Sequence, residues 1–404
     1  MSMNWEQLLS IKRFGLENYE NGNQEKRTEY QRDYDRLIFS SPFRRLQNKT
    51  QVFPLPGSVF VHNRLTHSLE VSSVGRSIGE NVGRELRKKY PQADAHFEEI
   101  GSIVSAACLA HDLGNPPFGH SGEEAISTYF SEGKGRSLQP LIEDENGRWN
   151  DFIYFEGNAN SIRLLMHQFK GRRKGGFAMT YSTIASIVKY SYSSELSGGK
   201  NKFGFFASEE EDYKCIATEL GIIKVSNQPL KYVRHPLVYL VEAADDICYQ
   251  VMDIEDAHKL NIVGTHEAKE LFLSFFNEEK RERRQKTLSY VTDINEQIAY
   301  LRASVIGLLV DACSVIFMEN EANILRGDFN GSLIKMLPEQ YKSAYNNCSQ
   351  FAAKNIYRSK DVLDVELAGY RIIGFLLDSF IKAVKNPQHS YSKLLLDRIP
   401  EQYD

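Results

Sequence analysis

The sequence predicts an all-α fold in which at most one short β-hairpin interrupts the helices. Apolar side chains recur at helical spacing over much of its length, as in the segment that carries Leu65, Leu69, Val74, Ile78 and Val82. We find no alternation of strands with helices, no internal repeat and no heptad array. With 404 residues, of which 42% are hydrophobic, the chain is long enough to bury a large core or to form two domains.

The first half of the chain is expected to begin with a loosely held polar arm, residues 1–25, and to continue with helices. Those helices are expected at 27–45 with a break at Ser41-Pro42, at about 63–89, and at 100–110, 155–169 and 180–193. Ser121 is expected to cap a further helix, with Glu124 as its capping-box partner. Polar, glycine-containing sequence predicts inserted loops at 131–150 and 195–212, and a short hairpin fits residues 52–61.

The second half is expected to be helical almost throughout. His235-Pro236 opens a long helix that runs through Asp256, because proline is tolerated in a first helical turn. Further helices are expected at 265–277, 285–319, 339–353 and 361–386. The polar run 278–287 is the best candidate for a boundary. We therefore expect three parts: the arm, a core at 26–277 and a helical C-terminal part at 278–404 packed on that core.

Composition narrows the choice of partners and compartment. The net charge of −4 and the pI of about 6.2 give no global attraction to nucleic acid or to an anionic membrane. The basic loop at 169–176 is most often a solvated segment, or else it holds a regulatory nucleotide or single-stranded DNA. Five scattered cysteines without a CxxC pair indicate reduced thiols in a cytoplasm. We see no signal core, and no apolar run that approaches the length of a membrane span.

Three predicted helices carry side chains that make sense together. His67 follows Arg64 by one helical turn, His111-Asp112 ends a buried helix, and Asp245, Tyr249 and Asp253 share one helical face from which Asp246 departs. A lone His-Asp pair is more often a helix cap beside a satisfied core histidine. Two histidines and two carboxylates on an apolar bundle instead indicate one divalent metal ion with open positions for water and substrate. Since no ligand is a thiolate, a structural zinc site is disfavoured.

His120 and Glu123 stand one helical turn apart just after the metal pair. A carboxylate in that position orients an imidazole and raises its pKa, which suits an acid–base role. The competing interpretation is a loop histidine hydrogen-bonded to a glutamate at a helix start.

The order His67, His111-Asp112, Asp245 resembles the HD phosphohydrolase superfamily. The motifs RLTHSLEV, HDLGNPPFGHSGEEA, FEGNAN, KFGFFASE and VEAADDICY look more closely like the bacterial dGTP triphosphohydrolase (dGTPase-like) family. The resemblance covers roughly 30–256, plus IYRSKDV near 356–362. It implies an HD-domain helical bundle with additional C-terminal helices. The implied reaction cleaves a deoxynucleoside triphosphate, with dGTP favoured, between the α-phosphorus and the 5′ oxygen to give a deoxynucleoside and tripolyphosphate.

The resemblance also implies roles for individual residues. The metal ligands are expected to be His67, His111, Asp112 and Asp245, and the metal is open among Mn, Mg, Fe, Co, Ni and Zn. His120 is expected to be catalytic with Glu123 as its acidic partner, either protonating the leaving 5′ oxygen or acting on the α-phosphate directly. The expected substrate contacts, to the phosphates or to the sugar, are Gln51, Arg64, Asn158, Lys189, Tyr249, Asp253 and Arg358.

Three of these substrate contacts have a plainer alternative. Arg64 and Lys189 are otherwise solvated surface cations, and Asp253 an ordinary exposed acid. The assignment of Arg358 is the weakest of the set, because the resemblance leaves open whether this residue contacts a phosphate or the site of a neighbouring subunit.

Two other functions compete with this interpretation. One is another HD phosphohydrolase: a phosphodiesterase, a nucleotidase or a (p)ppGpp hydrolase. The other is a nucleotide-binding or single-stranded-DNA-binding regulator with a vestigial site, against which the complete ligand set and the His120–Glu123 pair argue. The expected partners are the dNTP substrate, a second dNTP or single-stranded DNA as activator, and further copies of the chain, since hexamers are common in the family. No membrane association is expected.

Overall fold

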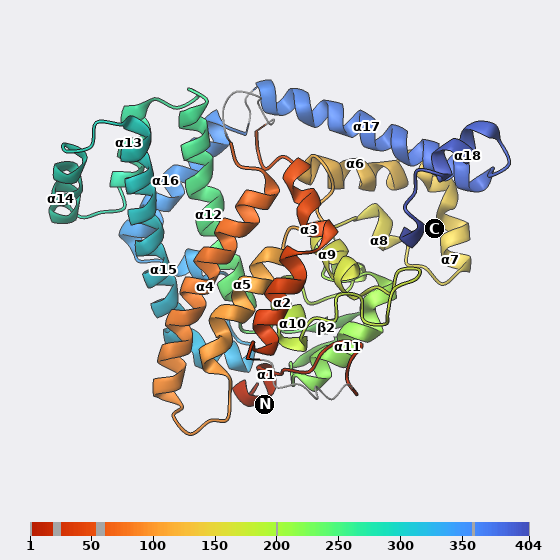
Figure 1. Cartoon of the computed structure of the whole chain (residues 1–404), viewed down its shortest axis with the longest axis horizontal. Coiled ribbons are helices and arrows are strands. Elements are labelled where there is room, and N and C mark those ends of the chain that lie inside the picture. The colour runs from red at the N-terminus through yellow and green to blue at the C-terminus, as the bar shows by residue number, and fades with distance from the viewer. Residues whose placement is uncertain (1, 19–25, 54–60, 199–200, 358–359, 404) are drawn as a thin grey trace.

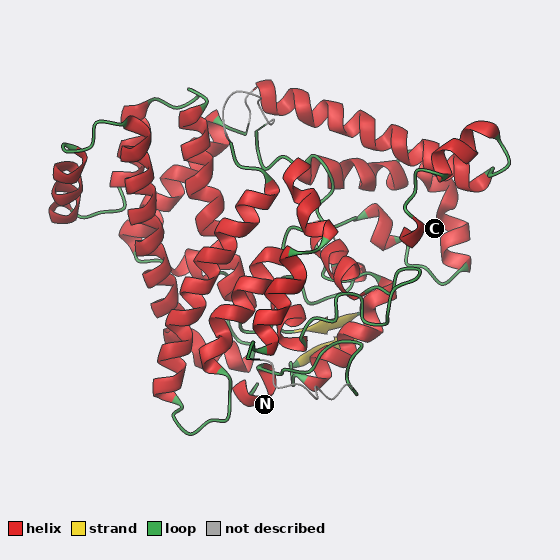
Figure 2. Cartoon of the chain, viewed as in Figure 1, coloured by secondary structure: helices red, strands yellow, loops and turns green. Residues whose placement is uncertain are grey.

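Helices dominate the computed structural model, which describes residues 2–18, 26–53, 61–198, 201–357 and 360–403 (Figures 1 and 2). The all-α prediction is confirmed. The N-terminal half contains α1 (Trp5–Leu8), α2 (Glu29–Ile38), α3 (Ser41–Arg45), α4 (Arg64–Lys89), α5 (Ile100–Ala110), α6 (Gly119–Ser131), α7 (Gln139–Asp144), α8 (Asn150–Ile153), α9 (Gly157–Met166), α10 (Tyr181–Ile187) and α11 (Glu210–Glu219).

The C-terminal half continues in the same way after one antiparallel hairpin, β1 (Lys224–Asn227) with β2 (Leu230–Tyr232). Its helices are α12 (Val238–Lys259), α13 (Thr265–Leu273), α14 (Glu278–Leu288), α15 (Ile294–Arg326), α16 (Glu339–Asn355), α17 (Lys360–Lys385) and α18 (Ser390–Leu396). The run at 278–287, proposed as a boundary, is therefore the charged helix α14.

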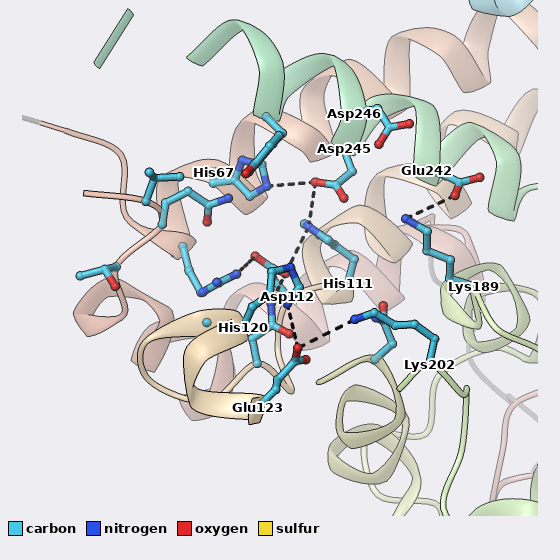
Figure 3. A pocket seen from close by; sticks show the side chains of 18 of the residues that line it. His67, His111, Asp112, His120, Glu123, Lys189, Lys202, Glu242, Asp245 and Asp246 are labelled. Carbon is cyan, nitrogen blue, oxygen red and sulfur yellow. Dashed lines mark hydrogen bonds and ion pairs between the residues drawn. The ribbon is translucent and has the colours of Figure 1, made fainter. Parts of the chain in front are cut away.

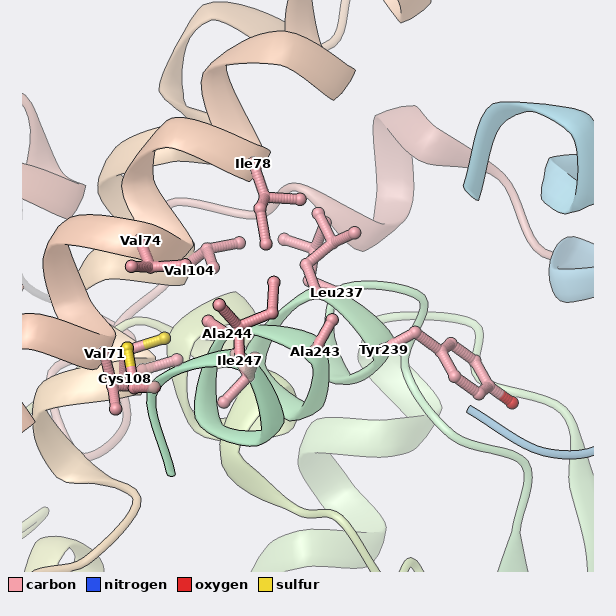
Figure 4. Packing of buried hydrophobic residues seen from close by; sticks show 14 of the residues in the cluster. Val71, Val74, Ile78, Val104, Cys108, Leu237, Tyr239, Ala243, Ala244 and Ile247 are labelled. Atoms are coloured by element: carbon pink, nitrogen blue, oxygen red, sulfur yellow. The ribbon is translucent and has the colours of Figure 1, made fainter. Parts of the chain in front are cut away.

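The core lies where α4, α5 and α12 pack together (Figure 4). Val71 and Ile78 from α4, Val104 from α5 and Ile247 from α12 are all completely buried. Helices α4 and α5 approach unusually closely, because a Cβ atom at Gly79 would lie 2.9 Å from the Cα atom of Gly101. This packing fixes the ends of three helices relative to one another, and the expected metal ligands stand on those ends.

Helix α15 corrects the expectation that no apolar run approaches the length of a membrane span. Within the described residues it is the one helix long and apolar enough to cross a membrane, with a mean hydropathy of 1.9 over its best 18-residue window. It packs against α4, α12 and α13. Leu301, Leu309 and Phe317 on it are completely buried, so its hydrophobicity is used in this packing.

The N-terminal segment is not loosely held, which corrects a second expectation. Trp5 and Leu8 are buried, and the indole Nε1 of Trp5 donates to Glu321 Oε1 at 2.8 Å. Arg13 forms an ion pair with buried Asp33 at 2.7 Å. Hydrophobic anchors in an otherwise polar stretch dock residues 2–18 onto the body of the protein, whereas 19–25 lie outside the described residues.

Several local predictions also need correction. Helix α6 begins at Gly119 without a side-chain cap, so Ser121 lies inside the helix. Residues 131–150 are largely helical, with a 3-10 turn at Lys134–Leu138 followed by α7. The hairpin lies at 224–232 and was not predicted there, whereas the expected hairpin at 52–61 falls mostly on residues 54–60, outside the described part. The expected loop at 195–212 contains two 3-10 turns and the start of α11.

Candidate active site

A pocket of about 540 Å³ opens where the start of α4, the end of α5, the start of α6, the middle of α12 and the start of α17 meet (Figure 3). Most of the residues predicted for the site line it: Gln51, Arg64, His67, His111, Asp112, His120, Glu123, Asn158, Lys189, Asp245 and Tyr249. Asp253 is not among the lining residues, and Arg358 lies outside the described part of the chain.

His67, His111 and Asp245 form a compact group suited to one metal ion. Their nearest ligand atoms lie within 4.8 Å of one another. His67 Nε2 is 3.1 Å and His111 Nε2 3.5 Å from the same oxygen, Asp245 Oδ1. Because the three residues stand on α4, at the end of α5 and on α12, the core packing brings them together, as the sequence predicted.

The backbone fixes the tautomer of His111. Its Nδ1 donates to the carbonyl of Cys108 at 2.6 Å, so Nε2 is left as the atom that faces Asp245. That Nε2 atom is buried and has no hydrogen-bond partner among the described residues. Burial alone lowers the pKa of His111, but the charges of Asp112 and Asp245 raise it to about 9. The raised pKa places a proton on Nε2 between the carboxylates, and a divalent cation would displace that proton and bind the nitrogen there.

Asp112 lies beside this group rather than within it. Its Oδ2 accepts from Arg64 Nη1 at 2.6 Å, and its Oδ1 accepts from the amide of Asn115 at 2.5 Å. The distance from Oδ1 to His111 Nε2 is 3.6 Å. Asp112 is therefore near enough to join the group, and at the same time it anchors the guanidinium of Arg64 in the pocket.

His120 and Glu123 form the expected hydrogen-bonded pair at the start of α6. His120 Nδ1 and Glu123 Oε2 are 2.8 Å apart, and Glu123 Oε1 accepts from the backbone N–H of Gly157 at 2.7 Å. The bond from Glu123 raises the pKa of His120. Phe118, just before them, has the left-handed backbone angle φ = 69°, a strained conformation that occurs preferentially at functional sites.

Three cationic side chains line the pocket, and one of them was not predicted. Arg64 and Lys189 were expected, and Lys189 Nζ lies 3.3 Å from Glu242 Oε1. The additional cation is Lys202, whose Nζ lies 2.8 Å from Glu156 Oε1 and 3.9 Å from Glu123 Oε2. Lys202 is the first residue of the KFGFFASE motif. The motif contributed to the family resemblance, but Lys202 itself was not predicted to contact the substrate.

Two stacked aromatic rings also line the pocket. Tyr249 stacks on Tyr357 with ring centroids 5.8 Å apart, and the Tyr357 hydroxyl donates to Asp253 Oδ2 at 2.6 Å. Asp253 thus lies behind Tyr357, and burial raises its pKa to about 7. Tyr357 was missed because nothing in the sequence joins a loop before α17 to a carboxylate on α12.

Two further observations refine the predicted lining. Gln51 Oε1 is buried without a hydrogen-bond partner in the described ranges, and it borders the pocket. Asp246 was expected to point away from the ligand face, yet it also lines the pocket. Burial and the neighbouring charge of Asp245 raise the pKa of Asp246 to about 7. The pocket lining therefore includes a carboxylic acid, Asp246, in addition to the predicted metal ligands Asp112 and Asp245.

Comparisons with known proteins agree with this arrangement. A model of the HD domain matches residues 64–225. The deoxyguanosinetriphosphate triphosphohydrolase-like protein of Synechocystis sp. is 36% identical over 99% of this chain and 91% of its own. The protein of the same name from Pseudomonas aeruginosa is 36% identical over 94% and 85%. The deoxyguanosinetriphosphate triphosphohydrolase of Yersinia enterocolitica is 30% identical over 99% and 86%.

Proposed function

We propose that this chain, which belongs to the deoxyguanosinetriphosphate triphosphohydrolase-like family of HD-domain hydrolases, hydrolyses deoxynucleoside triphosphates to a deoxynucleoside and tripolyphosphate. The family resemblance predicted from the motifs is thereby confirmed. One observation carries the proposal: the His67–His111–Asp245 group and the His120–Glu123 pair line the same pocket. A regulator that only binds nucleotides has no need of both.

His67, His111 and Asp245 would hold one divalent cation, with Asp112 as the fourth ligand. The unpartnered, buried Nε2 of His111 supports this assignment. A bound cation supplies Lewis acidity at a phosphoryl oxygen and lowers the pKa of bound water. Mn and Mg are the ions we would test first. The remaining residues of the pocket then have the task of binding and orienting the substrate.

The cations Arg64, Lys189 and Lys202 would bind the triphosphate, because each presents a charged donor to the pocket. His120 would act as the proton donor to the leaving 5′ oxygen. Its Nδ1 is engaged by Glu123, which leaves Nε2 for the substrate, and its raised pKa favours the protonated ring. Of the two roles that the sequence left open for His120, we thus propose protonation of the 5′ oxygen rather than direct action on the α-phosphate.

The sugar would lie against the stacked rings of Tyr249 and Tyr357. A ring packed against the 2′ carbon leaves no room for a 2′ hydroxyl, so deoxyribose should be preferred. The unpartnered Oε1 of Gln51 would accept a hydrogen bond from the 3′ hydroxyl. Asp253 would act on the sugar only through the hydroxyl of Tyr357, to which it is bonded.

A product assay tests the proposal against its nearest rival, another HD phosphohydrolase. The protein is incubated with each of the four dNTPs and with GTP, in Mn and in Mg, and phosphorus NMR identifies the released anion. We expect tripolyphosphate, with dGTP the favoured substrate. Release of pyrophosphate or orthophosphate would contradict the proposed bond cleavage.

The Asp112→Ala variant separates metal binding from folding in the same assay. We expect it to lose metal occupancy and turnover together while circular dichroism stays unchanged, because the helices keep their apolar faces. Full turnover by this variant in metal-stripped buffer would refute the metal assignment.

A further inference from the structure

The turn between α5 and α6 carries Asp112 at one end and delivers His120 at the other. Pro116 and Pro117 stand in the middle of it, and a proline has no backbone N–H with which to bond the turn together. Phe118, which follows them, has the left-handed backbone angle φ = 69°. A strained backbone of this kind persists only where the surrounding structure holds it.

Side chains from two other segments hold this turn. On one side, in α9, Ser161 Oγ accepts from the backbone N–H of Gly114 at 2.8 Å, and Asn160 Nδ2 donates to the carbonyl of Gly114 at 2.8 Å. On the other side, Lys49 Nζ donates to the carbonyl of Asn115 at 2.6 Å. Because a charged donor makes a stronger hydrogen bond than a neutral one, Lys49 is well suited to fix the turn.

Lys49 also holds the start of α4. Its carbonyl accepts from the backbone N–H of Arg64, the first residue of α4, at 3.1 Å. Asp112 closes the connection, since one of its carboxylate oxygens accepts from Arg64 Nη1 and the other from the amide of Asn115. A closed ring of four bonds therefore runs through Lys49, Arg64, Asp112 and Asn115. The ring joins α4, with its expected metal ligand, to the turn ahead of α6.

The ammonium of Lys49 is held at an electrostatic cost. Burial, together with the charges of Arg64 and Arg45, lowers the pKa of Lys49 to about 8 despite the opposing charge of Asp112. A lowered lysine pKa means that the fold disfavours the charged form of the side chain. Ionisable groups with perturbed pKa values cluster at functional sites, which supports a role for Lys49 in the pocket rather than in general stability.

We propose that Lys49 is a positioning residue for the reaction: it fixes the turn through the carbonyl of Asn115 and so sets where His120 stands relative to the metal ligands. This inference rests on the proposed function. The described residues that line the pocket include Asn115 and Arg64 but not Lys49, so Lys49 acts without touching the substrate. Catalysis depends on such placement, since a displacement of about 1 Å can cost about 10²-fold in rate.

Lys49→Met tests the inference because it removes the ammonium and keeps the length of the side chain. We expect kcat with dGTP to fall by about 10–10²-fold, with KM and metal content close to wild type, since the backbone carbonyl at position 49 still bonds the start of α4. Lys49→Arg keeps a charged donor and should recover most of the rate. Arg36→Met is the matched control, because Arg36 Nη1 donates to the carbonyl of Phe177 at 3.0 Å, outside the pocket lining. This control should keep the wild-type kcat.

A double-mutant cycle with His120 separates positioning from a general weakening of the fold. If Lys49 acts through His120, Lys49→Met should slow the His120→Ala variant by less than about threefold, because the effects of residues that act as a unit do not add. Losses that multiply would overturn the inference, as would an unchanged kcat in Lys49→Met or an equal loss in Arg36→Met. A wild type that releases no tripolyphosphate refutes the proposed function and the positioning role with it, whereas an active wild type with any of these three results refutes the positioning role alone.

Discussion

His120 faces the pocket with its ring held by Glu123. Replacing His120 with alanine removes the proposed proton donor and leaves the His67–His111–Asp245 group untouched. We expect kcat to fall by about 10²–10⁴-fold, with metal content and substrate affinity retained. Single-turnover kinetics with metal analysis and dNTP titration measure all three. A variant with near-wild-type kcat would assign His120 a structural role only.

The carboxylate of Glu123 controls the pH at which His120 loses its proton. Its carboxylate raises the pKa of His120, so the ring stays protonated to higher pH than a free imidazole. In Glu123→Gln the pKa of His120 should fall, and the alkaline limb of the kcat/KM–pH profile should move to lower pH. The loss at neutral pH should be smaller than that of His120→Ala, because the donor itself remains. An unmoved alkaline limb would mean that another group controls it.

The ring of Tyr249 is proposed to exclude the 2′ hydroxyl. Tyr249→Ala opens space beside the ring of Tyr357 and should raise the rate with GTP relative to dGTP, by up to about 10²-fold if shape alone discriminates. Tyr249→Phe, which keeps the ring, is the matched control and should retain the preference. Dideoxy-GTP should be a poor substrate for wild type, because it leaves Gln51 without a hydroxyl to bind. Equal wild-type rates on dGTP and GTP would defeat the argument.

At the scale of elements, the turn that starts α9 connects several groups of the pocket. Glu156 is completely buried, accepts from the backbone and side chain of Asn158 at 2.6 and 2.8 Å and holds Lys202. The next residue, Gly157, donates its N–H to Glu123. A Cβ at Gly157 would lie 2.0 Å from Asn115 Oδ1 and 2.7 Å from Glu123 Oε1, so a side chain there would displace both of these pocket residues. The motif FEGN thus positions Lys202, Asn158 and Glu123 together.

Glu156→Gln should therefore weaken triphosphate binding without touching substrate directly. The neutral amide can still accept a hydrogen bond from Lys202 but loses the ionic attraction that holds the ammonium in place, and a weakening of about 1.5 kcal/mol corresponds to roughly tenfold in kcat/KM. We expect the substitution to act mainly by raising KM, with a smaller effect on kcat. Glu209→Gln is the matched control, because Glu209 is equally buried and pairs with Arg163 at 2.9 Å outside the pocket lining. A similar loss in both variants would indicate general destabilisation.

The elements that the sequence predicted are those whose signal is periodic. Helical spacing located α4, α5 and α12, and the i, i+4 relation placed Asp245 and Tyr249 on one face. Lys202 and Tyr357 were missed because each reaches the pocket from a non-helical segment, where spacing carries no information about direction. Asp253 was placed on the correct face, but only the fold shows that Tyr357 stands in front of it.

For the molecule as a whole, composition and periodicity predicted the fold class but not how the termini dock. The anchors Trp5 and Leu8 belong to a short stretch of mixed apolar and polar residues, and the burial of Trp5 depends on partners far away in the chain, such as Glu321. Helix α17 shows the reverse: its apolar residues were predicted to lie in a helix, yet Leu367 and Phe375 on it are exposed. A local pattern predicts a helix but not which of its apolar residues are covered by distant segments of the chain.

His235 connects the docked N-terminal segment to the start of α12. It is completely buried; its Nε2 donates to the carbonyl of Leu8 at 3.2 Å, and its Nδ1 accepts from the backbone N–H of Leu237 at 3.2 Å. Only the neutral ring can do both. Burial lowers its pKa to about 4 from an ordinary value of 6.5. The folded protein therefore binds fewer protons here than the unfolded chain between these two pH values.

Acid should accordingly loosen this connection. The contribution of His235 to stability is complete above pH 6.5, falls progressively as the pH drops toward 4, and amounts to about 3 kcal/mol in total. Urea unfolding of wild type and His235→Gln at several pH values measures it, because the glutamine amide does not titrate. We expect the stability gap between the two proteins to narrow on acidification. His62 does not interfere: Asp256 and Glu70 raise its pKa to about 10 despite its burial, so its contribution changes only above pH 6.5. A gap that stays constant from neutral pH to pH 4 would show that His235 is not held neutral by the fold.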